Sequence, residues 1–511
     1  MTTTSLRNCI LSMWAFLLLA GSTRADVKLP AIFSDHMVLQ RDVAAPVWGW
    51  ADPGEQITVN IGGQSASATA DISGNWKIIL GKLSAGGPLT LTIAGQNSIV
   101  IQDVLVGEVW LGSGQSNMQL SVNDVTNAWR EKAAATFPQI RMFTVARRPA
   151  VTPQTNCEGS WVICTPETVG NFSATAYFFG RELHQQLAVP VGLIHASWGA
   201  TPIETWTSMP KQASLPALDP VLKQWQATLR IPYDETKAQA QYAHALAIWT
   251  TNAEALKQAG KTVPPKPQKK GDPRLDKNYP ANLFNGMINP IIPYAIRGAI
   301  WYQGENNTAN SWAALYAIQL PLMIQDWRER WHQGDFPFAW VQLPNYAPQN
   351  NGANWPVIRE CMLQSLAVTN TGMAITMDVG DPVNIHPKNK QAVGHRLALW
   401  AFAKVYGQPV PYSGPLPAAN QIKGNEVIIS FTHTDGGLIA QGGDLTGFVI
   451  AGDDHHWTPA KARIQGDQVI VSSPEVKSPQ AVRYAWAANP ACNLFNGAGL
   501  PASPFRTDDW K

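Results

Sequence analysis

The chain has 511 residues, of which 45% are hydrophobic and 14% charged, and its formal net charge is +2 at pH 7. This composition is too apolar for a disordered chain, and it lacks the long blocks of like charge found in nucleic-acid-binding tails. The length exceeds what one hydrophobic core usually serves, so we expect roughly two to four folding units.

The N-terminal segment, up to Ala25, has the pattern of a cleaved secretory signal. Arg7 precedes an apolar stretch from Ile10 to Ala20, and small residues follow it. This stretch is about half of the roughly 20 residues needed to span a bilayer, and Ser22 stands where a bacterial lipoprotein signal carries its lipidated cysteine. We therefore expect residues 1–25 to be removed and the protein to be exported, to the periplasm or outside the cell, with no membrane anchor.

Residues 26–106 have the pattern of a small β domain. In QITVNIGG the apolar side chains of Ile57, Val59 and Ile61 alternate with polar ones, and PLTLTIAG repeats this period of two. Turn signals such as SGN separate the runs. Short alternating strands at this spacing predict an antiparallel sandwich.

Residues 107–406 change to apolar, strand-like runs that are each followed by a helical pattern. The spacing of VWLGSG, PVGLIHASWG, RGAIWYQGE, PFAWVQL and GMAITMDVGD fits parallel βαβ units, so we expect an α/β domain. Helical spacing in DETKAQAQYAHALAIWTTNAEALKQAG predicts a helical insertion at about 208–274. Residues 407–511 return to a β pattern, with a hairpin at Gly466 and Asp467.

Two residues at predicted strand ends have the chemistry of a serine hydrolase. Ser116, in GSGQSNMQL, directly follows VLVGEVWL, and His386, in DVGDPVNIHPKNKQ, follows the strand-like MAITM. Open α/β sheets bind ligands at the carboxyl ends of their strands, which would bring the two residues together. The G-x-S-x-G pattern of α/β-hydrolases does not fit, because Met118 stands where the second glycine belongs. A plain turn serine is the alternative.

Two further strand ends offer hydrogen-bond donors. Serine catalysis needs a base for the serine proton and fixed donors for the charge that develops on the substrate oxygen. Gly199, in HASWGATPIETW, can bring its N–H close to that oxygen, and the carboxamide of Gln303, in WYQGENN, can supply another donor. Glycines and amides are also common in ordinary turns, so each motif alone is a weak signal.

The cysteines show no spacing typical of a zinc site. Cys157 and Cys164 flank EGSWVI and could close a short disulfide loop in an oxidising compartment, while buried free thiols are the alternative. Cys361 and Cys492 are the other cysteines that remain after signal removal. We expect no metal, no cofactor and no nucleic-acid partner.

Together these motifs resemble the sialate O-acetylesterases, a family of the Ser-Gly-Asn-His hydrolase superfamily. The resemblance rests on five stretches in order: GEVWLGSGQSNMQL, ASWGATPIETW, LFNGMINPIIPYAIRGAIWYQGENN, DVGDPVNIHPKNKQAVGHRLALWA and VRYAWAANPACNLFNGAGLPASPFRTDDW. It implies a flavodoxin-like parallel-sheet hydrolase domain flanked by N- and C-terminal β-sandwich-like regions. The insertion at about 208–274 is the part it covers least well.

The resemblance also implies a role for each candidate. Ser116 is the nucleophile, and its own N–H, the N–H of Gly199 and the amide of Gln303 form the oxyanion hole. Gln303 stands where many members of the superfamily use an asparagine. His386 is the base that activates Ser116, protonates the departing sugar hydroxyl and later activates water.

The identity of the acid that orients His386 is not decided by these motifs. Relatives often carry an aspartate at the positions that are Val383 and Asn384 here. Asp381 is therefore our first choice, Asp378 the second, and a Ser–His dyad supported by a backbone carbonyl the third.

Three more residues are candidates for contact with substrate. Glu305 would hold its loop, contact sugar hydroxyls or act as the acid. The planar guanidinium of Arg359 would meet a sialic acid carboxylate, although a structural ion pair fits it equally well. Trp301, or else Trp198 or Trp206, would stack on a pyranose face, but aromatic side chains are more often core.

The sequence therefore predicts an exported carbohydrate O-acetylesterase, a metal-free serine hydrolase whose preferred substrate is O-acetylated sialic acid. An acetylxylan esterase or other polysaccharide acetylesterase shares this chemistry and is the alternative among enzymes. The alternative of another class is a carbohydrate-binding protein without catalysis, which has no need to keep Ser116, Gly199, Gln303 and His386 together.

Overall fold

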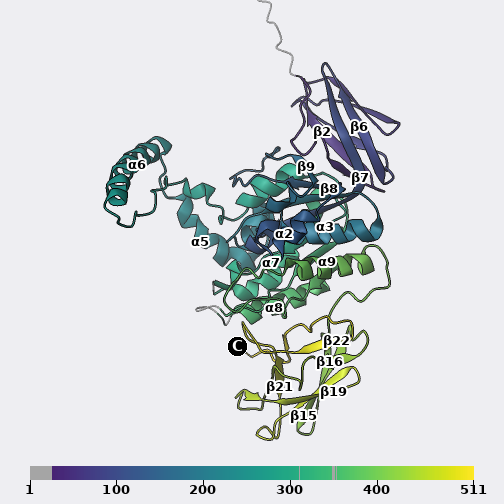
Figure 1. The fold of residues 1–511 in the computed structure, drawn as a ribbon, viewed down its shortest axis with the longest axis vertical. Coiled ribbons are helices and arrows are strands. Elements are labelled where there is room, and N and C mark those ends of the chain that lie inside the picture. Colours follow the sequence, from purple (N-terminus) through teal and green to yellow (C-terminus); the bar gives the residue numbers. More distant parts are fainter. Residues whose placement is uncertain (1–25, 310, 348–351, 353, 511) are drawn as a thin grey trace, which may run out of the picture.

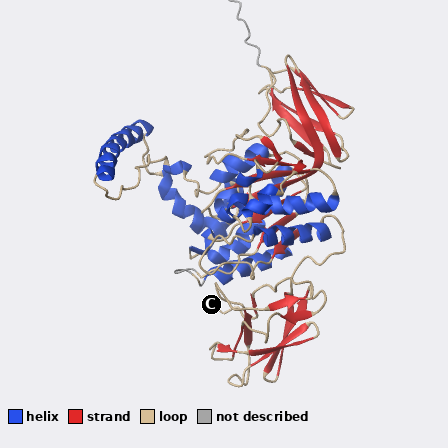
Figure 2. Ribbon diagram, viewed as in Figure 1, coloured by secondary structure: helices blue, strands red, loops and turns tan. Residues whose placement is uncertain are grey.

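The structure of the protein is a computed structural model that describes residues 26–309, 311–347, 352 and 354–510. Figure 1 shows a β region at the N-terminal end, a central body and a second β region at the C-terminal end, and Figure 2 shows that the helices lie in the central body and in the segment that projects from it. The secretory signal predicted for residues 1–25 lies outside the described residues. Within the described part, no helix is both long and apolar enough to cross a membrane.

The central body is a mixed α/β unit built on one sheet. The parallel strands follow the order β13-β12-β11-β7-β10-β8, and β9 pairs antiparallel with β8 at the edge. The strands are β7 (Ser98–Gly114), β8 (Phe137–Thr144), β9 (Trp161–Cys164), β10 (Val191–Ser197), β11 (Gly298–Tyr302), β12 (Phe338–Val341) and β13 (Thr371–Ala374). The helices are α1 (Ser116–Gln119), α2 (Ala128–Ala133), α3 (Ala174–Leu187), α4 (Met209–Ala213), α5 (Asp219–Leu229), α6 (Glu235–Gln258), α7 (Tyr316–Trp331), α8 (Asn354–Gln364) and α9 (Lys390–Lys404).

Helices cover both faces of this sheet. On one face, the ring of Trp301 lies 6.0 Å from that of Trp327 on α7. On the other, Trp110 of β7 lies 5.0 Å from Phe179 of α3 and 6.4 Å from Trp400 of α9. The parallel strands and the helices on both faces confirm the α/β prediction. The strands appear in the sequence as continuous apolar runs because both faces of the sheet are buried.

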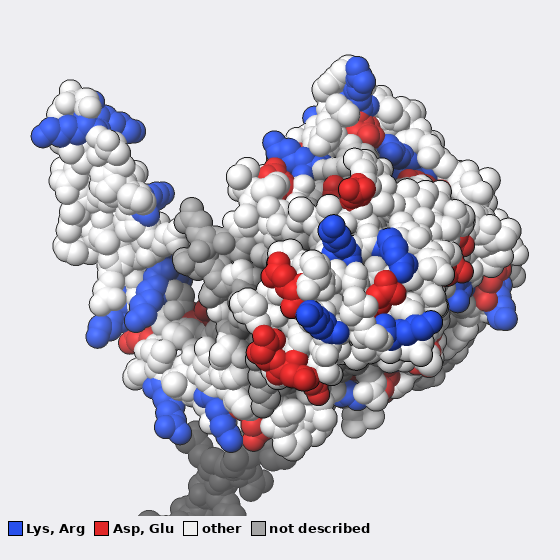
Figure 3. All heavy atoms as spheres, turned by 90° about the horizontal axis from the view of Figure 1, so that it is seen from below, with Lys and Arg blue, Asp and Glu red and all other residues white. Residues whose placement is uncertain are grey.

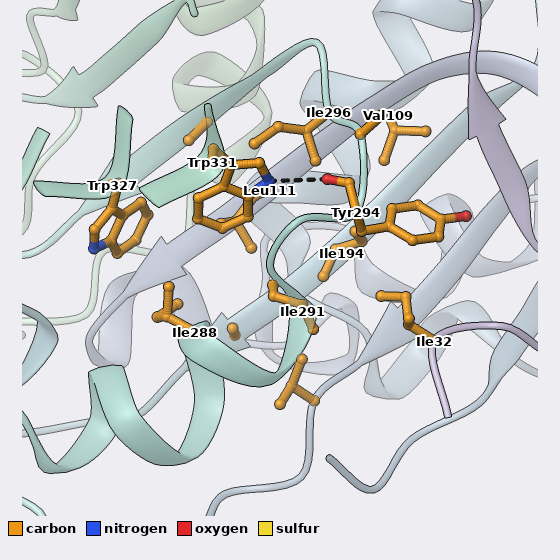
Figure 4. Close-up of a cluster of buried hydrophobic side chains, with 14 of the residues drawn as sticks. Ile32, Val109, Leu111, Ile194, Ile288, Ile291, Tyr294, Ile296, Trp327 and Trp331 are labelled. Carbon is orange, nitrogen blue, oxygen red and sulfur yellow. Dashed lines mark hydrogen bonds between the residues drawn. The ribbon is translucent and has the colours of Figure 1, made fainter. Parts of the chain in front are cut away.

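Figure 4 shows the cluster of apolar side chains that lies between α7 and the central sheet. Ile288, Ile291 and Ile296, from the segment before β11, lie among side chains of β7, β10 and α7. The indole N–H of Trp331 donates to the Tyr294 carbonyl at 2.9 Å, so a polar group of this segment is satisfied within the cluster.

Strand β7 belongs to two sheets. It is 17 residues long; its first half pairs with β6, and its second half pairs with β10 on one side and β11 on the other. The domain boundary expected between residues 106 and 107 therefore falls inside one continuous strand.

In the N-terminal β region, β1 and β6 pair with β7, while β2 and β5 form a separate two-stranded sheet. β3 pairs with β4 and β6, and β2 pairs with β5. Ile57, Val59 and Ile61 of β3 are buried, so the predicted apolar face is confirmed. The strands are β1 (Val38–Gln40), β2 (Ala45–Trp50), β3 (Gln56–Ile61), β4 (Gln64–Thr69), β5 (Asn75–Leu80) and β6 (Gly86–Ala94).

The insertion predicted at about 208–274 is helical. α6 stands away from the central body in Figure 1. The indole N–H of Trp249 donates to the Pro264 carbonyl at 2.8 Å, and Ala253 on the same stripe is buried. Trp249, on the apolar stripe of α6, thus contacts the insertion's own loop.

The C-terminal β region contains two four-stranded sheets and one two-stranded sheet. The predicted hairpin at Gly466 and Asp467 is confirmed, since β19 and β20 pair on either side of it. The strands are β14 (Leu416–Lys423), β15 (Glu426–Thr432), β16 (Leu438–Ala440), β17 (Phe448–Ala451), β18 (Thr458–Pro459), β19 (Lys461–Gln465), β20 (Gln468–Ser472), β21 (Ala481–Tyr484), β22 (Leu494–Asn496) and β23 (Phe505–Arg506).

The cysteines of the described part are free thiols. The disulfide considered between Cys157 and Cys164 is not formed, and both side chains are buried, as is Cys361. Burial raises the pKa of Cys157 and of Cys164 to about 12, so both stay protonated and unreactive at neutral pH.

A buried carboxylate ties the N-terminal region to the central sheet. The side chain of Glu108, in β7, has no exposed surface and accepts hydrogen bonds from Arg41 Nε at 2.5 Å and from Arg297 Nε at 2.7 Å. Burial alone would raise the pKa of Glu108, but the hydrogen bonds and charges of Arg297 and Arg41 outweigh burial and hold this pKa below its ordinary value of 4.5.

Replacing Glu108 by glutamine removes the charge that both arginines face. We expect Glu108→Gln to lower the free energy of unfolding by about 3 kcal/mol at neutral pH. Because the folded state lowers the pKa of Glu108, its stabilisation is present above pH ~4.5 and is lost as the pH falls through the folded pKa. Urea unfolding at several pH values should therefore show the wild type losing stability faster than the variant in acid.

The matched control is Asp219→Asn, in the exposed pair of Asp219 with Lys223. It should change the free energy of unfolding by less than ~0.5 kcal/mol. Equal losses from the two variants would contradict the role given to Glu108.

Candidate active site

Three parallel strands end at one level beside the candidate nucleophile. Gly114 of β7 pairs with Ser197 of β10 on one side and with Tyr302 of β11 on the other. The φ of Gly114 is 136°, and a Cβ there would lie 2.2 Å from the Tyr302 carbonyl oxygen, so this position requires glycine. The chain then turns sharply into α1, whose first residue is Ser116.

Ser116 is half-exposed, and Gly199 lies against it. A Cβ on Gly199 would be 3.2 Å from the Cβ of Ser116. Among the residues that the structure describes, none is hydrogen-bonded to the N–H or the hydroxyl of Ser116. The serine therefore has a free donor for a substrate oxygen, and the predicted neighbour Gly199 is in place.

The N–H of Gly199 is occupied in this conformation. It donates to Oε1 of Gln119, at the end of α1, at 2.7 Å. The carbonyl of Gly199 accepts from Lys277 Nζ at 2.6 Å, which holds the loop after β10. A substrate oxygen beside Ser116 would have to replace the Gln119 carboxamide to use this N–H.

Gln303 is fully buried, and its amide hydrogens both have protein acceptors. Nε2 donates to the Thr201 carbonyl at 3.1 Å and to Asn307 Oδ1 at 2.7 Å, while Oε1 accepts from the Tyr316 hydroxyl at 3.0 Å. Gln303 was predicted to donate to the oxyanion. In this conformation its carboxamide instead connects the loop after β11 to the loop after β10 by hydrogen bonds.

The loop that carries His386 is tied to the turn of Ser116. The side-chain amide of Asn117 donates to the Ile385 carbonyl at 3.0 Å, so the neighbours of the two candidate residues are hydrogen-bonded. His386 is half-buried; burial, and then the charge of Lys390, lower its pKa below the ordinary 6.5. A neutral imidazole at neutral pH is the form that accepts a proton.

Neither of the aspartates considered for orienting His386 is bonded to it. Asp378 makes a bidentate ion pair with Arg396, at 2.6 and 2.7 Å. Asp381 accepts from the backbone N–H groups of Val383 and Asn384, which closes its own turn. The structure contains no hydrogen bond between the His386 ring and any described residue, so the preference for Asp381 has no support in this conformation.

A buried polar network lies under these loops. The Asn117 amide also donates to Glu305 Oε1 at 2.5 Å, and its oxygen accepts from Lys390 Nζ at 2.6 Å. Lys390 Nζ donates in addition to the Pro387 carbonyl at 2.8 Å. Glu305 is only 5% exposed, which favours the loop-holding role predicted for it over contact with substrate.

Burial shifts the charges of this network toward neutrality. It lowers the pKa of Lys390 to about 7, with the Glu305 carboxylate acting in the opposite direction. It raises the pKa of Glu305, against the hydrogen bond of Asn117 and the charge of Lys390. Oε2 of Glu305 has no partner within the described chain.

Asn117 and Lys390 were not among the residues singled out from the sequence. The position of Asn117, directly after Ser116, was a signal that could have identified it. Lys390 begins α9 and looks in the sequence like an exposed charge, although its side chain is buried. Only the fold reveals that the two are paired.

Arg359 does not face a ligand. It has no exposed surface, and its guanidinium donates to backbone carbonyls at Leu343, Pro344, Ala487 and Ala488. Burial lowers its pKa to about 9. The prediction that Arg359 meets a sugar carboxylate is corrected accordingly, since the side chain joins the loop after β12 to the C-terminal region.

Trp301 is a core residue. It has no exposed surface, and its indole N–H donates to the Tyr316 hydroxyl at 3.2 Å. Trp206, which packs edge-on against it, is equally buried. Of the three tryptophans considered for sugar stacking, only Trp198 is partly exposed, beside Gly199. The prediction that Trp301 stacks on a sugar ring is therefore wrong, because its side chain is buried.

Comparisons with known proteins find carbohydrate esterases among the relatives of this chain. The family model described as "Carbohydrate esterase, sialic acid-specific acetylesterase" matches residues 276–402. A sialate O-acetylesterase from Mus musculus is 30% identical over 94% of both chains, and one from Rattus norvegicus is 29% identical over 94% of both. The crystal structure of a carbohydrate acetylesterase from Xanthomonas citri is 36% identical and superposes with a TM-score of 0.81, over 95% of this chain and 100% of that one.

Removing the Asn117 carboxamide should both destabilise the protein and displace Ser116. We expect Asn117→Ala to lower the free energy of unfolding by about 2–3 kcal/mol, because Lys390 and Glu305 lose a buried partner. It should also slow the covalent labelling of Ser116 by a fluorophosphonate about tenfold, which mass spectrometry can follow.

The control is Asn123→Ala, which removes an exposed carboxamide that bonds Asn171. It should change the stability by less than ~0.5 kcal/mol and leave the labelling rate unaltered. If Asn117→Ala labels at the wild-type rate, the network does not position the serine.

Proposed function

The chain belongs to the sialate O-acetylesterase family of carbohydrate esterases, and from this membership we propose that it hydrolyses O-acetyl esters of sialic acid through an acetyl-enzyme on Ser116. Its carbohydrate O-acetylesterase activity follows from the family. The observation that supports the serine chemistry is the hydrogen bond from Asn117 to Ile385, because it holds the loop of His386 against the turn of Ser116.

In the proposed acylation, His386 takes the proton of Ser116 while the serine oxygen attacks the acetyl carbonyl carbon. Negative charge develops on the carbonyl oxygen beside the free N–H of Ser116, and beside the N–H of Gly199 once Gln119 has turned away. The ester bond to the sugar then breaks, and His386 donates its proton to the departing sugar oxygen.

Deacylation repeats these steps with water. His386 removes a proton from a water molecule, whose oxygen attacks the acetyl group on Ser116. The serine oxygen departs, takes the proton back from His386, and acetate is released. The low pKa of His386 favours this cycle at neutral pH, because the ring begins each half-reaction neutral.

We also propose that His386 works as part of a dyad. Asp378 is engaged by Arg396, and Asp381 by its own turn, so neither is free to orient the ring. In this proposal Gln303 and Glu305 hold the loop after β11, and burial, followed by the charge of Lys390, lowers the pKa of His386.

Esters of neutral polysaccharides, such as acetylated xylan, are the second candidate substrates. Arg359, the residue predicted to recognise the carboxylate of sialic acid, is occupied by backbone carbonyls. This observation favours a site that does not need a substrate carboxylate.

The finer points of architecture and location are part of the proposal. The strands β10-β7-β11-β12-β13 have the order 2-1-3-4-5 in the chain, which supports a flavodoxin-like assignment. We propose the division into residues 26–106, 107–406 and 407–511, with β7 continuing across the first boundary and with sandwich-like outer regions. The N-terminal pattern of the sequence supports export to the periplasm or beyond.

Acetate release from a small acetyl ester tests the nucleophile. Ser116→Ala should lower kcat by at least about 10⁴-fold, because it removes the oxygen that carries the acetyl group in the proposed mechanism. Asp381→Asn should keep most of the activity, within about threefold, if the dyad is right. An active Ser116→Ala would refute the serine mechanism, while a loss of activity in Asp381→Asn would restore Asp381 as the orienting acid.

A comparison of kcat/KM for O-acetylated sialic acid and for acetylated xylan oligomers separates the two substrate classes.

The pH dependence of kcat/KM tests the influence of Lys390. The base must be unprotonated, so activity should rise with pH through the pKa of His386, with a midpoint below 6.5. Lys390→Met removes a positive charge that lowers this pKa, so the midpoint should move upward.

The matched control is Lys388→Met, which removes an exposed charge from the same loop, and its midpoint should stay near that of the wild type. Equal midpoints in the wild type and Lys390→Met would contradict the electrostatic role of Lys390.

A further inference from the structure

A cavity of about 800 Å³ lies between the C-terminal β region and the start of α8. Trp457, Trp486 and Trp510 line it from the β region, and Val357 lines it from α8. This volume is typical of small-molecule sites. Neither Ser116 nor His386 is among the described residues that line it, so it is separate from the ester-hydrolysing centre.

The three indoles of the cavity are partly exposed. In this they differ from the tryptophans of the central sheet, such as Trp301, which have no exposed surface. Flat, apolar and accessible rings suit the C–H face of a pyranose. A cluster of such rings in a protein of a carbohydrate-esterase family points to a sugar.

Each ring is held in place by a neighbour. The guanidinium of Arg483 lies 4.2 Å from the Trp457 ring centroid, and that of Arg506 lies 5.2 Å from the Trp486 ring. The imidazole of His455 stacks on Trp510, with centroids 3.7 Å apart. Rings that are already fixed lose little conformational freedom when a ligand binds.

The positive charges at the cavity are neutralised by protein carboxylates. Arg483 pairs with Asp508 at 2.6 Å, and Arg506 pairs with Glu360 at 2.8 Å. Asp509 also lines the cavity. Figure 3, seen from the C-terminal end, shows acidic and basic side chains interspersed on that face. The cavity therefore offers no net positive charge to attract an anionic sugar, so its ligand is neutral.

One wall of the cavity is bonded to the loop that carries His386. Ala488, which lines the cavity, accepts a hydrogen bond from the N–H of Tyr346 at 3.1 Å. The next residue, Ala347, donates to the Pro382 carbonyl at 3.0 Å, in the loop between β13 and α9. A glycan that fills the cavity therefore lies beside the loops of the proposed catalytic site.

We infer that this cavity binds neutral pyranose units of the glycan whose acetyl group is removed. The inference rests on the proposed function, since it makes the C-terminal β region a substrate-binding part of the esterase. The indoles stack on the sugar rings, and polar atoms of the lining, such as the Asp509 carboxylate, accept from sugar hydroxyls.

Calorimetry with the full chain tests the inference. The probes are two neutral oligosaccharides, N-acetyllactosamine and xylohexaose, and the anionic sialyllactose. We expect at least one neutral probe to bind the wild type and Ser116→Ala equally well. Trp510→Ala should weaken that binding about tenfold, as expected for the loss of roughly one stacking contact. Trp457→Leu keeps an apolar side chain and provides the same test if Trp510→Ala does not fold.

The control is Trp129→Ala, since Trp129 is 68% exposed on α2 and has Arg130 over its ring at 5.0 Å. It should bind the neutral probe like the wild type. In kinetics, Trp510→Ala should lower kcat/KM for an acetylated oligosaccharide about tenfold more than for a small acetyl ester.

The inference is overturned if neither neutral probe binds, or if the folded tryptophan variants bind like the wild type. Binding of sialyllactose alone, lost in Trp510→Ala, would overturn the neutral character of the ligand. Because calorimetry does not depend on turnover, these results are independent of the serine mechanism. An active Ser116→Ala would refute the mechanism and leave the binding result unaffected.

Discussion

The carboxamide of Asn117 is the group on which the rest of the site depends. Its nitrogen donates to Glu305 and to the Ile385 carbonyl, and its oxygen accepts from Lys390. These partners lie in the loop after β11, in the loop between β13 and α9, and at the start of α9, all far from Asn117 in the chain. One neutral side chain thus connects three segments by hydrogen bonds, and it does so one residue away from Ser116.

The surroundings of this carboxamide favour a neutral imidazole at His386. Partial burial of the ring disfavours a positive charge there, and so does the charge of Lys390. Glu305 compensates for part of the lysine charge from the opposite side of the carboxamide.

Much of this arrangement could be predicted because strand ends can be read from local patterns. The apolar run before Ser116 and the glycine at 199 identified two neighbouring strand ends, and they are in contact. The roles given to Arg359 and Trp301 failed, because local sequence does not reveal whether a side chain faces the solvent or the core. Residue type alone could not show that the donors of Gln303 were already in use, because its partners Thr201 and Asn307 become neighbours only in the fold.

The shared strand β7 makes the N-terminal region inseparable from the turn that carries Ser116. A strand that runs through two sheets cannot be cut at their junction without removing an edge from each, so the region is not a module that evolution could exchange freely. A single residue inserted near the junction would turn every later side chain of the strand to the opposite face. Glu108 and Gly114 would then leave the positions that only they can fill, and the serine would move with them. Length variation among related chains is therefore expected in the loops and in the projecting helix, while the number of residues between the two sheets stays constant.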